Sequence, residues 1–274
     1  MQKHRYILNI KILLFIKRTE LIKVLKKDVV IGLGEIGKPI MQILEKSIQT
    51  EGYDINPQLY SNKKSKKYYE IEFLHICIPY NQKFNAEILQ YAKKYAPKAI
   101  IIHSTIRPNT TKTLQKKLKI PIIYSAIRGV HKRMLQDLRR YTKFYSIYDW
   151  APNSKWASKI FEMRMKKAGI KTKKMSNPLT LELAKIVVDT SYYGWLINYA
   201  QISNLLAKKY GVNYDEMWSF ADEIHNFLGN RPKMFPGFIG GHCVIPNLDL
   251  INEETLEIIK EINSDYAKIL KKKY

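Results

Sequence analysis

The sequence of 274 residues predicts an α/β fold in which a parallel-sheet domain is followed by a mainly α-helical domain. Three observations carry this prediction. A glycine-rich turn joins a short apolar strand to a helix, and strand-like and helix-like segments then alternate as in β-α-β units. From Ser176 onward the apolar residues recur at helical spacing instead. We therefore predict an extension over residues 1–27, a sheet domain over 28–175 and a helical domain over 176–274.

Residues 1–27 combine apolar and basic residues and differ from the pattern that follows. Such a composition is typical of a secretory signal or of a helix that lies on a membrane surface. Asn9 and Lys11 interrupt the apolar run, and no cleavage site of small residues follows. We interpret the segment as an extension of the fold, with a role at a membrane surface as the alternative.

The glycine-rich turn contains Gly32, Gly34 and Gly37 and lies between the apolar run 29–31 and a predicted helix over Pro39–Ile48. This context is typical of the dinucleotide-binding turn of a Rossmann-type sheet. Gly32 would make the tight turn, Gly34 would let the backbone approach a diphosphate, and Gly37 would allow close helix packing. Helix N-termini bind anions, so the intervening Glu35 and Ile36 are also predicted to line the cofactor site.

Asp54 follows the glycine turn by about 20 residues, where a carboxylate can accept hydrogen bonds from the ribose hydroxyls of NAD. The same carboxylate would repel the 2′-phosphate of NADP. The sequence therefore predicts NAD as the cofactor, and it indicates no metal.

The alternation of elements continues to Gly169. The predicted strands are Phe73–Ile78, Ala99–His103, Ile120–Tyr124 and Phe144–Tyr148, and the predicted helices are Asn85–Tyr95, Thr110–Leu118 and Ser154–Ala168. Ligands bind at the carboxyl ends of parallel strands. Pro79, Ser104 and Thr105 follow two of these strands and are therefore expected to lie near the nicotinamide. Cys77, inside an apolar strand pattern, is expected to be a buried thiol.

A long helical pattern over Leu179–Tyr210 opens the second domain, and a further helix is predicted over Glu216–Phe227. At about 1.5 Å per residue the first helix would exceed 40 Å, which is longer than a small domain needs for itself. We therefore expect a homodimer that packs through this helix.

The composition limits the classes of partner. The net charge is +23, but lysine is spread over nearly all predicted surface helices, without an RNA-binding signature or a helix-turn-helix pattern. We expect no nucleic-acid site, with direct nucleic-acid binding as the less favoured alternative, and an anionic small-molecule substrate would gain from this field. No run reaches the roughly 18 apolar residues of a membrane span. The two cysteines indicate no disulfide framework, which favours a cytoplasmic protein.

A second glycine-rich loop, over residues 237–243, ends in Cys243. Gly240 and Gly241 allow backbone N–H groups to approach a ligand. A thiolate next to such donors and to His242 is a candidate nucleophile. A buried structural cysteine in an ordinary turn is the alternative.

These motifs together resemble the UDP-glucose/GDP-mannose dehydrogenase family over roughly residues 28–260. The similarity rests on the two glycine loops, on Asp54, on a Ser-Thr-Ile-x-Pro-x-Thr-Thr loop that begins at Ser104, and on Glu182-Leu183-x-Lys185-x-x-x-Asp189. The last pattern puts Lys185 and Asp189 on one helix face.

The resemblance implies a two-step oxidation with NAD. An alcohol would lose a hydride, Cys243 would capture the aldehyde as a thiohemiacetal, a second hydride transfer would form a thioester, and water would release an acid. The resemblance gives Lys185 and Asp189 the task of holding a substrate oxygen or a water. The candidate substrate-binding residues are Arg128, His131, Gly240, Gly241 and His242.

Three departures from the family pattern leave other functions open. The family's third domain, which closes over the nucleotide, has no counterpart up to Tyr274, so a separate chain could supply it. Ile127 and His131 stand where the family has two glutamates, and a histidine could still serve as a general base. Asp189 replaces the usual asparagine. A single-step dehydrogenase of the hydroxyacid type and a non-catalytic NAD-binding or partner-binding protein are therefore the alternatives.

Overall fold

The computed structural model describes residues 25–59, 69–228, 236–250 and 254–271. Its central sheet contains five parallel strands in the order β2-β1-β3-β4-β5, which confirms the predicted fold class. The strands are β1 (Leu25–Ile31), β2 (Gln49–Tyr53), β3 (Tyr69–Ile76), β4 (Ala99–Ile102) and β5 (Ile122–Tyr124). Because β1 begins at Leu25, the sheet starts three residues before the predicted boundary at Asp28. The rest of the predicted extension, residues 1–24, lies outside the described residues.

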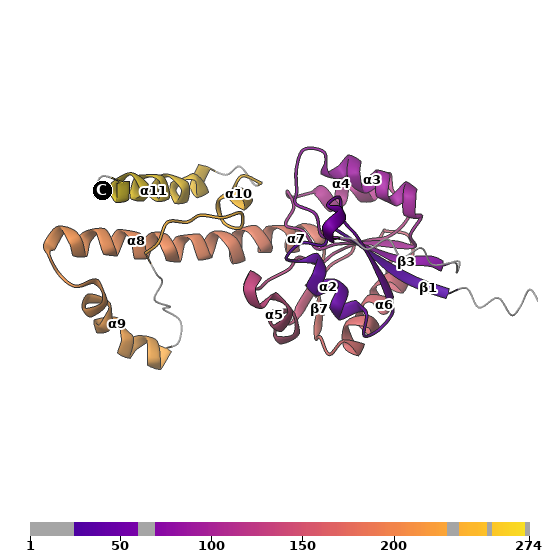
Figure 1. Cartoon of the computed structure of the whole chain (residues 1–274), viewed down its shortest axis with the longest axis horizontal. Coiled ribbons are helices and arrows are strands. Elements are labelled where there is room, and N and C mark those ends of the chain that lie inside the picture. The colour runs from indigo at the N-terminus through magenta and orange to yellow at the C-terminus, as the bar shows by residue number, and fades with distance from the viewer. Residues whose placement is uncertain (1–24, 60–68, 229–235, 251–253, 272–274) are drawn as a thin grey trace, which may run out of the picture.

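Helices cover both faces of the sheet (Figure 1). Parallel strands are buried on both faces and therefore read as continuous apolar runs. One apolar cluster joins the sheet to α2 (Gly37–Leu44), α5 (Met134–Arg140) and α6 (Ser154–Lys167), and the other joins it to α3 (Phe84–Tyr95) and α4 (Thr110–Lys117). All the helices predicted for this domain are present within a few residues, except that α2 ends at Leu44 instead of Ile48. The helix α5 was not predicted.

The segment predicted as a strand over Phe144–Tyr148 does not extend the parallel sheet. Its strand β6 (Lys143–Tyr145) pairs in parallel with β7 (Thr172–Lys174) in a separate two-stranded sheet. An antiparallel bridge between Tyr124 and Ser146 connects this small sheet to the end of β5. Three-residue strands carry little pattern of their own, which is why β7 was missed.

A buried ionic cluster fixes α6 to the sheet. The guanidinium of Arg164 donates one hydrogen bond to Asp28 on β1 and another to Glu72 on β3. Arg164 is 2% exposed, and its guanidinium carbon lies 4.4 Å from the ring centroid of Phe73. Asp28 also accepts the backbone N–H of Phe73 at 2.9 Å and lies 3.3 Å from His75 Nε2. Burial lowers the pKa of His75.

The long helix is present as predicted, but its middle is wider than an α-helix. It consists of α7 (Pro178–Leu183), a π-helix (η3, Ala184–Ser191) and α8 (Tyr192–Tyr210), and Gly211 ends it with φ +71°. It is followed by α9 (Tyr214–Leu228), the short α10 (Ile245–Leu248) and α11 (Glu254–Lys271). The helix α11, which was not predicted, packs alongside α8 (Figure 1). Among the residues with described structure, no helix is long and apolar enough to cross a membrane.

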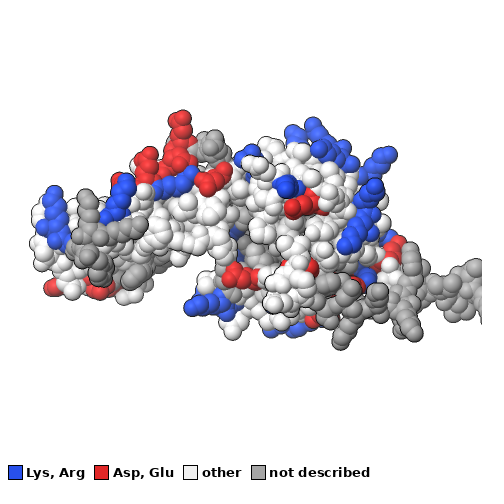
Figure 2. Space-filling model, turned by 45° about the horizontal axis from the view of Figure 1, so that its top comes forward, with Lys and Arg blue, Asp and Glu red and all other residues white. Residues whose placement is uncertain are grey.

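Charged residues are distributed over both parts of the molecule. On the face shown in Figure 2, Lys and Arg occur on the sheet domain and on the helical part, and they are interspersed with Asp, Glu and uncharged residues. This distribution agrees with the diffuse positive field expected from the sequence.

Candidate functional site

The first glycine loop has the geometry of a tight turn. Gly32 has φ +88°, and a Cβ added to it would lie 2.9 Å from the backbone oxygen of Cys77. A Cβ on Gly37 would lie only 1.6 Å from the backbone oxygen of Gly32. A side chain at either position would therefore clash with the backbone of this protein, so the fold itself requires glycine at both. Gly34 differs, because a Cβ there would meet nothing within 4 Å.

Asp54 lies directly beside this loop, at the end of β2. Its Oδ2 accepts the backbone N–H of Leu33 at 2.6 Å, and its Oδ1 accepts the backbone N–H of Asn56 at 2.8 Å. The carboxylate is half-buried. The structure thus brings together the open position at Gly34 and the acidic side chain that the sequence predicts for the ribose.

The loops after β3 and β4 lie at the same edge of the sheet. Ser104 Oγ donates to the backbone oxygen of Ile78 at 2.5 Å, so one loop is tied to the other. Pro79 is exposed and Thr105 is half-buried. Since the glycine loop follows the neighbouring strand β1, the predicted cofactor-binding residues all lie at the carboxyl ends of adjacent strands.

Buried polar side chains anchor the cysteine loop to the helical domain. Gln201 on α8 donates to the backbone oxygen of Gly237 at 2.8 Å. Asn263 on α11 accepts the N–H of Ile239 at 2.8 Å and donates to its carbonyl oxygen at 3.1 Å. Gln201 and Asn263 are themselves hydrogen-bonded at 3.2 Å. Gly240 and Gly241 follow this anchored stretch, and Gly241 has φ +72°, which favours glycine.

Cys243 lies where the two domains meet. Its side chain is exposed, so the buried structural cysteine considered as an alternative does not apply. Partial burial raises the pKa of the thiol, Lys185 lowers it, and Glu35 of the first glycine loop raises it. His242 Nε2 lies 3.3 Å from Glu35 Oε2. The loop that carries Cys243 is thus close both to the long helix and to the first glycine loop.

Lys185 and Asp189 form an ion pair on the π-helix. The distance from Lys185 Nζ to Asp189 Oδ2 is 2.6 Å, and the lysine side chain is more deeply buried than the aspartate. Thr190 Oγ1 donates to the backbone oxygen of Lys185 at 3.1 Å. π-Helical segments occur frequently at functional sites. The predicted shared face of Lys185 and Asp189 is present, and Lys185 is close enough to influence Cys243.

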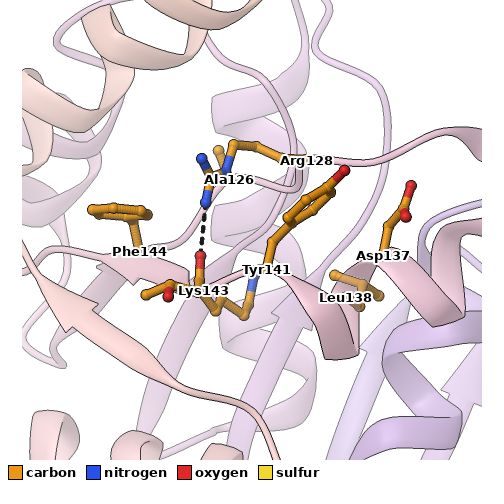
Figure 3. Close-up of a pocket in the computed structure, with 8 residues that line it drawn as sticks. Ala126, Arg128, Asp137, Leu138, Tyr141, Lys143 and Phe144 are labelled. Carbon is orange, nitrogen blue, oxygen red and sulfur yellow. Dashed lines mark hydrogen bonds between the residues drawn. The ribbon is translucent and has the colours of Figure 1, made fainter. Parts of the chain in front are cut away.

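Arg128 lines a pocket, shown in Figure 3, that does not include the cysteine loop. Its guanidinium donates to the backbone oxygen of Thr142 at 2.8 Å and lies 4.9 Å from the ring centroid of Phe144. Lys143, in the same wall, is buried, and burial lowers its pKa to about 7. The pocket is lined by Ala126, Arg128, Asp137, Leu138, Tyr141, Thr142, Lys143 and Phe144. Cys243 is not part of this lining, so the pocket is separate from the cysteine loop.

The two positions that carry glutamate in the family pattern differ in this structure. Ile127 is 5% exposed and belongs to the apolar core of the sheet domain. The backbone of His131 begins a short 3₁₀ helix, His131–Arg133, and its side chain lies outside the described residues.

Glu182 joins the two domains and was not predicted as a site residue. It is fully buried and accepts the backbone N–H groups of Asn109 at 2.6 Å and of Thr111 at 3.0 Å, at the start of α4. Burial raises the pKa of its carboxyl group. Glu182 thereby fixes α7, and with it the adjacent π-helix, to the sheet domain. Its place in the Glu-Leu-x-Lys pattern was the available signal.

A parallel-sheet domain that continues into a long helix is also the fold of solved UDP-sugar dehydrogenases. The UDP-D-ManNAc dehydrogenase of Pyrococcus horikoshii has a TM-score of 0.73 at 19% identity over 89% of this chain and 69% of that one. The UDP-N-acetyl-mannosamine dehydrogenase Cap5O of Staphylococcus aureus has a TM-score of 0.66 at 18% identity, with the same coverage.

The Mycobacterium tuberculosis 3-hydroxyisobutyrate dehydrogenase is also similar, with a TM-score of 0.60 at 14% identity over 91% of this chain and 94% of that one. No protein-family model matches the sequence, and no curated protein matches it at a significant level. At these identities the similarity establishes the fold.

Proposed function

We propose that the chain is an NAD-dependent dehydrogenase that oxidises an alcohol group on a small or anionic substrate. The observation that carries this proposal is Gly34, which is open to a ligand although the glycines on either side of it are required by the fold. Asp54 beside the loop supports NAD over NADP. The shared fold with several dehydrogenases supports the same conclusion.

In this mechanism the glycine loop and Asp54 hold the cofactor, and NAD when bound supplies the hydride acceptor. After a first hydride transfer to NAD has produced an aldehyde, the Cys243 thiol would add to its carbonyl and form a thiohemiacetal. Loss of a second hydride, to a second NAD, and of the hydroxyl proton would give a thioester, which water would hydrolyse to an acid and the free thiol. Lys185 would stabilise the negative charge that develops on the substrate oxygen. Asp189 would hold the lysine in place through the observed ion pair.

A single-step oxidation is the second candidate. It is favoured by the similarity to the 3-hydroxyisobutyrate dehydrogenase, whose chain is covered almost completely. The buried apolar Ile127 also leaves this position without a carboxylate. The two candidates differ in product, because a single-step enzyme forms one NADH per substrate and no acid, whereas the cysteine mechanism forms two NADH and an acid.

Binding of NAD is expected to raise the melting temperature by several degrees, since a ligand at 100 times its dissociation constant adds about 2.7 kcal/mol. NADP is expected to give a smaller shift, and Asp54→Ala is expected to lose the preference for NAD. Differential scanning fluorimetry with both nucleotides measures this. Asp265→Ala, which removes an exposed carboxylate from α11, is the matched control. No shift with either nucleotide would overturn the dehydrogenase proposal in favour of a non-catalytic, partner-binding protein.

We also propose that two copies associate along the long helix. Apolar side chains on this helix are strongly exposed, among them Val188 at 69%, Tyr199 at 63% and Tyr210 at 72%. Large exposed apolar side chains along one helix are typical of an interaction site. Light scattering at micromolar concentration is expected to give twice the mass of 32.2 kDa, and a monomeric mass would contradict the dimer.

A further inference from the structure

One side-chain contact connects the two glycine-rich loops. Glu35 belongs to the loop between β1 and α2, and His242 directly precedes Cys243. The distance between His242 Nε2 and Glu35 Oε2 is 3.3 Å, and the two side chains are 71% and 56% exposed. The contact therefore joins the proposed cofactor loop to the loop that carries the proposed nucleophile.

Glu35 is an unfavourable residue at the proposed position of a diphosphate. It lies between Gly34 and Gly37, directly before the N-terminus of α2, where backbone N–H groups and the helix dipole attract anions. A carboxylate at this place repels a second anion through the same electrostatic field. A protonated His242 in contact with Glu35 would offset that repulsion.

Lys185, the cation that lowers the pKa of Cys243, is paired with another carboxylate. Lys185 Nζ is paired with Asp189 Oδ2 at 2.6 Å, so part of its charge is already balanced on the π-helix. Glu35 nevertheless acts on the cysteine, because its carboxylate raises the pKa of Cys243 in opposition to Lys185. The negative charge of Glu35 therefore lies in the proposed cofactor loop and also raises the pKa of the Cys243 thiol.

We propose that Glu35 tunes cofactor affinity: its carboxylate opposes the cofactor diphosphate, and His242 lessens this opposition, without abolishing it, when the cysteine loop is docked. NAD binding is thereby coupled to the position of Cys243, with Glu35 and His242 as positioning residues. This inference rests on the proposed function, because it requires a dinucleotide at the first glycine loop.

Isothermal titration calorimetry with NAD on four proteins tests the coupling: wild type, Glu35→Gln, His242→Gln and the double variant. Titrations at pH 6 favour the charged form of histidine side chains. Glu35→Gln is expected to tighten NAD binding roughly two- to fivefold, the range of an exposed charge interaction. His242→Gln is expected to weaken binding by a similar factor and to have no effect when Glu35 is already Gln.

The reactivity of Cys243 gives a second readout that does not require turnover. Glu35→Gln is expected to speed the alkylation of Cys243 by iodoacetamide at neutral pH, since more of the thiol is ionised once the nearby carboxylate is gone. Cys77, whose pKa burial raises to about 12, should react slowly. Cys243→Ser identifies the fast-reacting thiol.

Glu45→Gln is the matched control, because it removes an exposed carboxylate at the other end of α2. Equal NAD affinities for Glu35→Gln and Glu45→Gln would overturn the inference, and so would a His242→Gln effect that persists without Glu35. In both cases NAD still binds and the proposed function stands. Absence of NAD binding to the wild type would instead overturn the proposed function itself.

Discussion

Arg164→Leu is expected to destabilise the protein by roughly 3–5 kcal/mol, because it leaves the buried carboxylate of Asp28 without its guanidinium. It also takes from Glu72 one of its two cations, the other being Lys26 at 2.9 Å. Asp28 is completely buried and Glu72 is 4% exposed, so water cannot replace the guanidinium. A loss of this size is a large part of the 5–15 kcal/mol that is typical of folded proteins. Urea unfolding followed by circular dichroism measures the change.

Arg133→Leu is the matched control for this prediction. Arg133 also pairs with an aspartate, Asp137, but the arginine side chain is 52% exposed, so water can solvate Asp137 once the guanidinium is gone and the loss of stability is expected to be much smaller. Where Arg164→Leu does not fold, the triple variant with Asp28→Asn and Glu72→Gln is expected to recover soluble protein, since it removes the unpaired charges. Equal midpoints for Arg164→Leu and Arg133→Leu would contradict a stabilising role for the buried cluster.

Gly37→Ala is expected to cost about 3 kcal/mol or more, at the upper end of the effects of overpacking. The added methyl group would lie 1.6 Å from the backbone oxygen of Gly32, so no side-chain rotation can relieve the contact. The turn between β1 and α2 must open instead. The expected results are a lower melting temperature and loss of the NAD-induced shift.

Gly34→Ala is expected to weaken NAD binding without destabilising the fold. A methyl group at Gly34 meets nothing within 4 Å, so the stability is expected to change by less than about 1 kcal/mol. NAD affinity is nevertheless expected to fall at least about tenfold, because 1.4 kcal/mol of steric cost against a diphosphate is sufficient. Unchanged NAD binding by Gly34→Ala would mean that the cofactor does not approach this loop.

Features that depend on residues close together in the chain could be predicted from the sequence. Gly32 and Gly37 mark a turn that only glycine can form, and Asp54 follows it at the spacing that one helix and one strand require. The apolar runs of β3 and β4 predicted buried parallel strands because each strand is covered on both faces. Lys185 and Asp189 are one helical turn apart, so their pairing also follows from spacing alone.

The missed features depend on partners that are distant in the sequence. Arg164 reads as a surface residue of a basic helix until the sheet places Asp28 and Glu72 beside it. Glu182 likewise becomes a cap only when α7 meets the start of α4. Contacts between residues this far apart in the sequence leave no periodic pattern in it. The contact of Glu35 with His242 is of the same kind.

The π-helix determines the direction in which the side chains of α8 face around the axis of the long helix. Each residue inserted into an α-helix advances the following residues by about 100° around the axis. The wider turns over Ala184–Ser191 therefore set the direction in which Tyr199 and Tyr210 face, relative to the sheet domain. Loss of a single residue from this segment would rotate the whole exposed apolar surface without altering its composition. Insertions and deletions here, more than substitutions along α8, would decide which surface this protein presents to another molecule.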